Sequence, residues 1–84
     1  MTLEERFADA QERVKKLSSS PSNDNLLKLY AMYKQSTAGD VQGSRPGALD
    51  FKGRAKYDAW AAQKGIAKDK AMEGYVALVD TLTK

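Results

Sequence analysis

Apolar residues recur along the chain at steps of three and four, which is the period of an amphipathic α-helix. The first run is Leu3, Phe7, Ala10, Val14 and Leu17. Thr2 precedes this run and Glu5 stands three residues later, which is the spacing of a capping box at a helix start. We therefore predict a helix that begins after Thr2 and ends at the serines of residues 18–20 and Pro21.

A second helix is predicted to start after Ser22, a favourable N-cap residue, and to run to about Ser36. Its apolar positions are Leu26, Leu27, Leu29, Tyr30, Met32 and Tyr33. They cover more than one stripe, so this helix should have two faces that are at least partly buried. Residues 37–50 then show no period, and Arg45, Pro46 and Gly47 predict an ordered turn within this long loop.

Two further helices are predicted in the second half of the chain. Asp50 can cap the third, whose apolar stripe is Phe51, Ala55, Ala59 and Ala62 and which should stop at Gly65. The fourth should begin near Ala67 or Lys68, and its apolar positions are Ala71, Met72, Tyr75, Val76, Val79 and Leu82. Gly74 lies inside it without a local reason and should cost about 1 kcal/mol relative to alanine. This pattern indicates an all-α helical bundle.

Composition narrows the possible functions. We expect residues 1–84 to form a single domain, because 84 residues provide one small core. The chain has neither cysteine nor histidine, so it lacks the commonest metal ligand and general base. No metal site, no catalytic residues and no enzymatic activity are therefore expected. The polar N-terminus is unlike a secretory signal, and no apolar run reaches the roughly 20 residues of a membrane span, so we expect a cytoplasmic protein.

The net charge of +3 is unevenly distributed. Residues 1–40 carry six basic and six acidic groups, and residues 65–84 carry three of each. The excess therefore lies in residues 41–64, which contain Arg45, Lys52, Arg54, Lys56 and Lys64 against Asp50 and Asp58. A local basic excess is typical of a surface that meets an anion, although on charge alone a solvated helix face is the simpler interpretation.

Aromatic and basic residues suggest a binding site. Tyr30 and Tyr33 are three apart, so both rings can project from one side of a helix, where stacking a base is worth roughly 1–3 kcal/mol. Lys34 and Lys56 could each give a phosphate a charge-assisted hydrogen bond worth about 1.5–3 kcal/mol, but their convergence does not follow from the sequence. Taken alone, ordinary core packing is the favoured interpretation for these two tyrosines, as it is for Tyr75 and Trp60.

One long stretch, LYAMYKQSTAGDVQGSRPGALDFKGRAKYDAW at residues 29–60, resembles the acyl-CoA-binding protein family. It matches the family's tyrosine-x-x-tyrosine-lysine-glutamine, its arginine-proline-glycine loop and its aspartate-phenylalanine-x-glycine-lysine/arginine-alanine-lysine signature. KG at 64–65 and AMEGY at 71–75 continue in register, so the resemblance runs from Phe7 to Leu82. It implies a four-helix up-down-down-up bundle that shelters one acyl-CoA ligand and needs no cofactor.

The resemblance also implies roles for individual residues. Tyr30 and Tyr33 would frame the adenine, while Lys34 and Lys56 would meet the 3′-phosphate. The other implied ligand-binding residues are Lys15, near the ligand, Ala31 and Met32, which line the pocket, and Tyr75, which contacts the CoA moiety. The sequence departs from the family pattern at Met32, often histidine, at Tyr57, usually tryptophan, and at Ala67, usually a serine N-cap.

The expected function is the non-catalytic binding, buffering and intracellular transport of medium- and long-chain fatty acyl-CoA esters. The expected partner is the acyl-CoA ligand itself, with no nucleic acid, transient contacts with membranes or acyl-CoA-using enzymes, and a monomer as the default. One alternative is a small basic helical module that binds nucleic acid or an anionic membrane surface. Binding that falls steeply with salt and ignores acyl length would favour that alternative. A protein-interaction bundle is the other.

Overall fold

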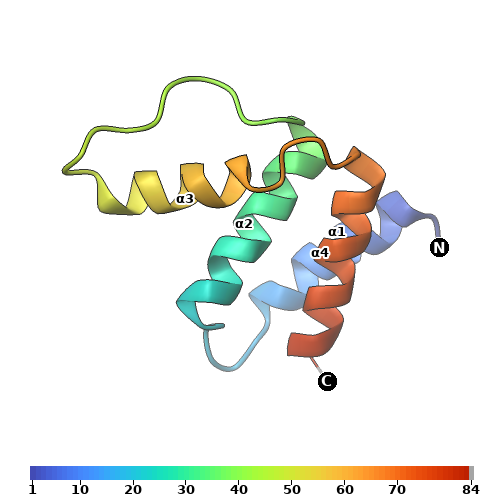
Figure 1. Cartoon of the computed structure of the whole chain (residues 1–84). Helices are drawn as coiled ribbons and strands as arrows, with labels where there is room; N and C mark the ends of the chain where they lie inside the picture. The colour runs from blue at the N-terminus through green and yellow to red at the C-terminus, as the bar shows by residue number, and fades with distance from the viewer. Residues whose placement is uncertain (84) are drawn as a thin grey trace.

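The computed structural model describes residues 1–83 and contains four α-helices: α1 (Leu3–Lys15), α2 (Asn23–Thr37), α3 (Phe51–Ala61) and α4 (Lys68–Leu82) (Figure 1). These described residues include no β-strand, so the prediction of an all-α fold is confirmed. None of the four helices has the length and apolar character needed to cross a membrane.

The helix starts follow the predicted capping residues. In α1 the Thr2 N–H donates to Glu5 Oε1 at 2.9 Å and the Glu5 N–H donates to Thr2 Oγ1 at 3.1 Å, which completes the capping box. Ser22 accepts a hydrogen bond from the Asn25 N–H at the start of α2. Ala67 precedes α4 and provides no side-chain cap, so the predicted loss of a cap at this helix is confirmed.

The helices pack in the order α1, α4, α2, α3, so α4 lies between α1 and α2, while α3 contacts α2. The result is a flat molecule with principal extents of 40 × 29 × 14 Å. Figure 1 shows α3 at one end of the molecule, away from α1 and α4. Helix α2 contacts both α4 and α3, which agrees with the prediction that two of its faces are at least partly buried.

The contacts between α1 and α4 define their relative direction. Near the start of α1, Phe7 packs against Tyr75, and farther along Arg13 Nη2 lies 2.8 Å from Asp80 Oδ1. Residue numbers rise together on the two helices, so α1 and α4 run parallel. The Asp80 hydrogen bond raises the pKa of the Arg13 guanidinium, which also pairs with Asp9 on its own helix.

Helix α2 runs antiparallel to α4. A Cβ atom added at Gly74 would lie 2.8 Å from Met32 Sδ, and one added at Gly39 would lie 3.6 Å from Lys68 Cε. Residue numbers therefore fall along α4 as they rise along α2. The first distance also gives a reason for Gly74, because a Cβ atom there would require the Met32 thioether to shift where the two helices approach closely.

The core belongs to α1, α2 and α4. Its buried members are Phe7, Ala10, Leu29, Tyr75, Val76 and Val79. Helix α3 contributes no buried residue, and Phe51, the first residue of its predicted apolar stripe, is 75% exposed. The helix ends at Ala61, and tighter turns lead to Gly65, whose φ of 89° places it in the left-handed region.

The long loop between α2 and α3 is held against α3 by side chains of that helix. Trp60 Nε1–H donates to the Gly39 carbonyl at 2.7 Å, and the Tyr57 hydroxyl donates to the Gly43 carbonyl at 3.1 Å. The Arg45 guanidinium pairs with both oxygens of Asp58, at 2.9 and 2.7 Å. These contacts replace the apolar burial that α3 lacks.

A second set of hydrogen bonds closes the loop at its start. Asp40 Oδ1 accepts from Gln35 Nε2 at 2.8 Å and from the Gly65 N–H at 2.9 Å, and Gln35 Nε2 also donates to the Ile66 carbonyl. Gln35 is 1% exposed, and these two hydrogen bonds of its Nε2 amide help a polar side chain to be buried on the inner side of α2. The hydrogen-bonded turn of the loop joins Gly47 to Asp50, two residues later than the turn predicted at Arg45–Gly47.

Candidate ligand-binding site

An aromatic cluster connects the core to the surface between α1, α2 and α4. The Phe7 ring packs edge-on against Tyr75, with 5.0 Å between centroids, and stacks with Tyr33 at 6.1 Å. Tyr75 is buried, and burial, assisted by Tyr33, raises the pKa of its phenol, which therefore stays protonated at neutral pH. Tyr33 is exposed at the edge of the cluster and can receive a second ring on its free side.

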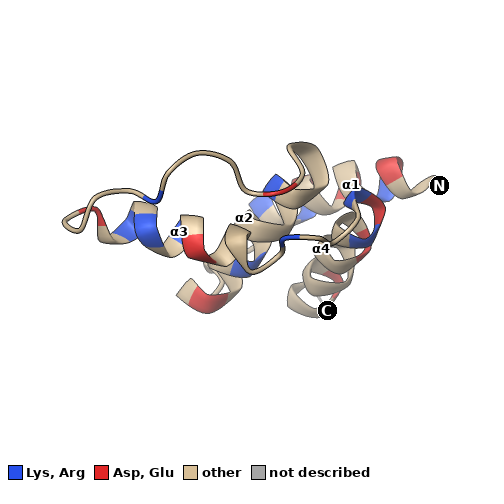
Figure 2. Ribbon diagram, turned by 45° about the horizontal axis from the view of Figure 1, so that its top comes forward, with Lys and Arg blue, Asp and Glu red and all other residues tan. Residues whose placement is uncertain are grey.

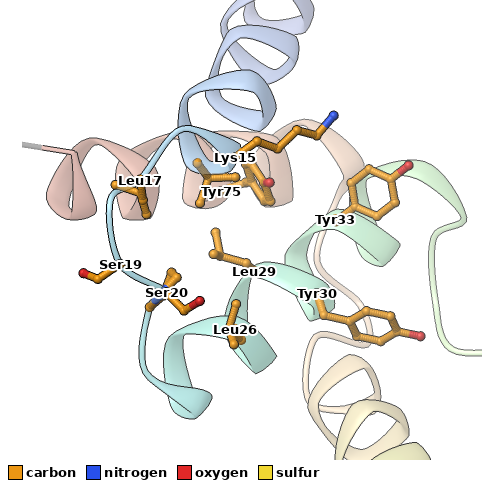
Figure 3. A pocket seen from close by; sticks show the side chains of 11 residues that line it. Lys15, Leu17, Ser19, Ser20, Leu26, Leu29, Tyr30, Tyr33 and Tyr75 are labelled. Atoms are coloured by element: carbon orange, nitrogen blue, oxygen red, sulfur yellow. The ribbon is translucent and has the colours of Figure 1, made fainter.

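A cavity of about 420 Å³ opens beside this cluster (Figure 3). Its lining comes from the end of α1, the following loop, α2 and α4: Val14, Lys15, Leu17, Ser19, Ser20, Pro21, Leu26, Leu29, Tyr30, Tyr33 and Tyr75. Figure 3 shows the rings of Tyr30 and Tyr33 projecting from α2 to one side, with their hydroxyls outward. The Lys15 ammonium also extends toward the outside, so the opening of this cavity is polar while its floor is apolar.

A second cavity of about 420 Å³ lies between the first halves of α2 and α3. Its lining residues are Asn23, Leu26, Leu27, Phe51, Lys52, Ala55 and Lys56. Leu26 lines both cavities, so the two hollows are neighbours on either side of one leucine. The second cavity combines an apolar floor with two lysines, a lining that suits an alkyl chain attached to an anionic group.

Two reciprocal contacts join α2 to α3 beside these cavities. Lys56 Nζ lies over the Tyr30 ring at 5.3 Å from its centroid, and Lys34 Nζ lies over the Trp60 ring at 4.9 Å. These are cation–π distances. We call these four residues, Tyr30, Lys34, Lys56 and Trp60, the seam. Tyr30 pairs with Lys56, and four residues later on each helix Lys34 pairs with Trp60. Residue numbers therefore rise together and the two helices run parallel, which completes the predicted up-down-down-up order.

The charge of the seam is positive. Arg45 is neutralised by Asp58, and the Arg45 hydrogen bond lowers the pKa of the Asp58 carboxyl. Among the ion pairs of residues 1–83, none involves Lys34, Lys52 or Lys56. Figure 2 shows the basic residues gathered along the first half of α3. A phosphate group at the seam would therefore meet cations without displacing a carboxylate.

The structure brings most of the predicted site residues to this region. Lys15, Tyr30, Tyr33 and Tyr75 line the first cavity, and Lys56 lines the second. Lys34 lies at the seam, where its ammonium is over the Trp60 ring while the Lys56 ammonium is over the Tyr30 ring. Ala31 is 2% exposed and Met32 packs against the core, so neither belongs to the lining of the two cavities.

Several residues of the site were not singled out from the sequence. Trp60 was interpreted as a packing residue, yet the Lys34 ammonium lies over its ring and its indole N–H donates to the Gly39 carbonyl in the loop. Leu26, Leu27 and Phe51 were assigned to helix stripes, yet they line the second cavity. The spacing of Lys56 and Trp60, which repeats that of Tyr30 and Lys34, was the available signal.

The chemistry of the site is that of binding. It offers aromatic faces for a planar base, ammonium groups for phosphate and an apolar hollow for an alkyl chain. Among the described residues, no group of three or more histidine, cysteine or acidic side chains is placed to hold a metal ion.

Comparison with known proteins gives consistent results. The family model described as "Acyl CoA binding protein" matches residues 4–79. The chain is 56% identical over 82 residues to acyl-CoA-binding protein homolog 1 of Caenorhabditis elegans, covering 98% of this chain and 93% of that protein. The crystal structure of Oryza sativa acyl-CoA-binding protein 2 superposes with a TM-score of 0.90 at 42% identity, covering 95% of this chain and 87% of that one. The crystal structure of the Moniliophthora perniciosa protein superposes with a TM-score of 0.87 at 36% identity, covering 100% and 85%.

Proposed function

The chain belongs to the acyl-CoA-binding protein family, and on that premise we propose that residues 1–84 act as one domain that binds a single long-chain acyl-CoA. The protein would buffer and carry this ester in the cytoplasm as a monomer, without catalysing a reaction. The observation that carries the proposal is the pair of neighbouring cavities beside the seam of Tyr30, Lys34, Lys56 and Trp60. One ligand with a nucleotide end and an alkyl end matches this arrangement.

The nucleotide end would be bound at the seam and at the opening of the first cavity. Tyr30 and Tyr33 supply ring faces on one side of α2 for the adenine (Figure 3). Lys34 and Lys56 extend from neighbouring helices, so both ammonium groups can reach the 3′-phosphate. Tyr75 and Lys15, which line the same cavity, are suited to contact the rest of the CoA moiety.

The acyl chain would lie in the second cavity, among Leu26, Leu27, Phe51 and Ala55. Full burial of a methylene contributes about 0.8 kcal/mol. Each pair of additional buried carbons should therefore strengthen binding about 15-fold, until the cavity is filled. This dependence on length is the reason for proposing a preference for long-chain esters.

Isothermal titration calorimetry with palmitoyl-CoA, free CoA and palmitate at one salt concentration tests the proposal. We expect one-to-one binding of palmitoyl-CoA, much weaker binding of CoA and the weakest binding of palmitate. Similar affinities for palmitoyl-CoA and palmitate would contradict it, because the base and phosphate contacts would then contribute nothing. Shorter acyl-CoA esters provide the internal control for the alkyl end.

A further inference from the structure

Leu26 stands between the two cavities. Of the residues that the structure describes, it alone lines both of them. Figure 3 shows its side chain projecting from α2 into the space between Ser20 and Tyr30. The side chain is 44% exposed and belongs neither to the buried core nor to the apolar residues packed against that core. It therefore separates two hollows without supporting the fold.

Part of the first cavity has no role in the proposed contacts with the nucleotide. Those contacts use the aromatic and basic residues of the lining and leave its aliphatic residues unassigned: Val14, Leu17, Pro21 and Leu29. An aliphatic surface gains from covering an alkyl chain, and a phosphate gains nothing from it. The long alkyl part of the proposed ligand would lie in the second cavity, on the other side of Leu26.

The second cavity has the size of a long acyl chain and is too small for a very long one. A methylene group occupies about the share of liquid volume that a water molecule takes, roughly 30 Å³. At about 420 Å³, the second cavity therefore accommodates roughly 14 chain carbons. Further carbons would either stay in water or cross Leu26 into the aliphatic part of the first cavity.

We propose that Leu26 sets the upper limit of the acyl length that this protein selects, because its side chain closes the second cavity toward the aliphatic part of the first. The inference rests on the proposed function. A chain that fills the second cavity finds no further apolar surface behind Leu26, so additional carbons add no burial. The favoured ligands are then long-chain esters such as myristoyl- and palmitoyl-CoA, and very-long-chain esters bind no more tightly.

Displacement calorimetry with saturated acyl-CoA esters, from octanoyl- to lignoceroyl-CoA and each below its micellar concentration, tests this limit. For the unmodified protein we expect affinity to rise about 15-fold for every two carbons up to myristoyl- or palmitoyl-CoA. Beyond that length the affinity should stay constant, so that arachidoyl-CoA and the longer lignoceroyl-CoA bind equally. A continued rise of the same size up to lignoceroyl-CoA would overturn the proposal.

Leu26→Ala is the decisive variant, because it opens the partition and removes no core side chain. We expect it to bind lignoceroyl-CoA at least about tenfold more tightly than arachidoyl-CoA, since the longer chain can now reach the first cavity. Leu27→Ala is the matched control: it removes the same side-chain atoms from the second cavity alone and should bind the two esters equally. Equal binding of both esters by Leu26→Ala would overturn the role of Leu26.

Two readings of the same series separate the possible failures. No palmitoyl-CoA binding by the unmodified protein, or an affinity that ignores acyl length throughout, would reject the proposed function and the inference with it. Binding that rises with length but reaches the same limit in Leu26→Ala would overturn the inference alone. Free CoA should bind equally to the unmodified protein and to Leu26→Ala. A loss of CoA affinity as large as the change for lignoceroyl-CoA would make Leu26 a nucleotide contact and overturn its role as a partition.

Discussion

The three helices α1, α2 and α4 and the loop with α3 are stabilised in different ways. The first region contains every buried apolar residue of the core, including the aromatic cluster of Phe7 and Tyr75. The second has no buried residue in its helix and is fixed by directional contacts, such as Trp60 with Gly39 and Arg45 with Asp58. Apolar burial is non-directional and strong in sum, whereas exposed polar contacts are individually weak.

This difference places the proposed binding site at the boundary between the region with the buried core and the region held by directional contacts. Lys34 and Tyr30 project from the first of these regions, and Lys56 and Trp60 project from the second. A ligand that bridges the seam would add contacts where the protein itself has few. We therefore expect ligand binding to protect α3 from local opening more than it protects the core.

Substitution of two phenylalanines, one in each region, should give the largest difference in the free energy of unfolding. Phe7→Ala should lower the free energy of unfolding by about 3–5 kcal/mol, because it removes a buried ring between Tyr33 and Tyr75. Phe51→Ala should change it by less than about 0.5 kcal/mol, since that ring is exposed. Urea unfolding followed by circular dichroism measures both, and equal losses would show that α3 belongs to the core after all.

Substitution of the seam lysines should weaken ligand binding and leave the fold unchanged. Lys34→Ala and Lys56→Ala should each weaken palmitoyl-CoA binding by about 1.5–3 kcal/mol, the value of a charge-assisted hydrogen bond. The same variants should weaken binding of 3′-dephospho-palmitoyl-CoA much less. Calorimetry with both ligands is the measurement, and Lys28→Ala, an exposed lysine of α2 outside both cavity linings, is the control. Equal losses of affinity for the two ligands would mean that these lysines do not contact the 3′-phosphate.

A smaller change should stabilise the core region without touching the site. Ala67 stands at the N-cap of α4 with φ −63° and ψ 148°, a conformation that serine adopts freely, and makes no capping hydrogen bond. Ala67→Ser should raise the free energy of unfolding by about 1 kcal/mol. Urea unfolding should show this gain while palmitoyl-CoA affinity stays constant; an unchanged midpoint would mean that the helix start is already satisfied by water.

As the pH falls, the loop between α2 and α3 should loosen before the core unfolds. The Gly65 N–H and the Gln35 amide lower the pKa of Asp40, and the Arg45 guanidinium lowers the pKa of Asp58. A carboxyl with a lowered pKa in the folded state stabilises it above the unfolded pKa, and this contribution is lost as pH falls through the folded pKa. The indole N–H signal of Trp60, the single tryptophan, should report the loosened loop by NMR at a higher pH than core unfolding by circular dichroism. Simultaneous transitions would contradict the two-region description.

The sequence by itself determined the helices and much of the chemistry of the site. Capping by Thr2, Ser22 and Asp50 was predictable because it depends on residues three apart, which are neighbours in any helix. The pairing of Tyr30 with Tyr33 on one side of α2 follows from the same local geometry. The signature of residues 29–60 added the family and its expected ligand.

Only the tertiary structure decided which distant residues meet and which side chains stay exposed. The contact of Lys34 with Trp60 spans the long loop, so no local rule predicts it. Whether Phe51 is buried depended on how α3 docks, and its contacts with α2 leave that ring in solvent beside a cavity. Gly74 was unexplained until Met32 was found packed against it from another helix. Helical periodicity specifies a face, but the neighbour that covers that face is set by packing across the whole chain.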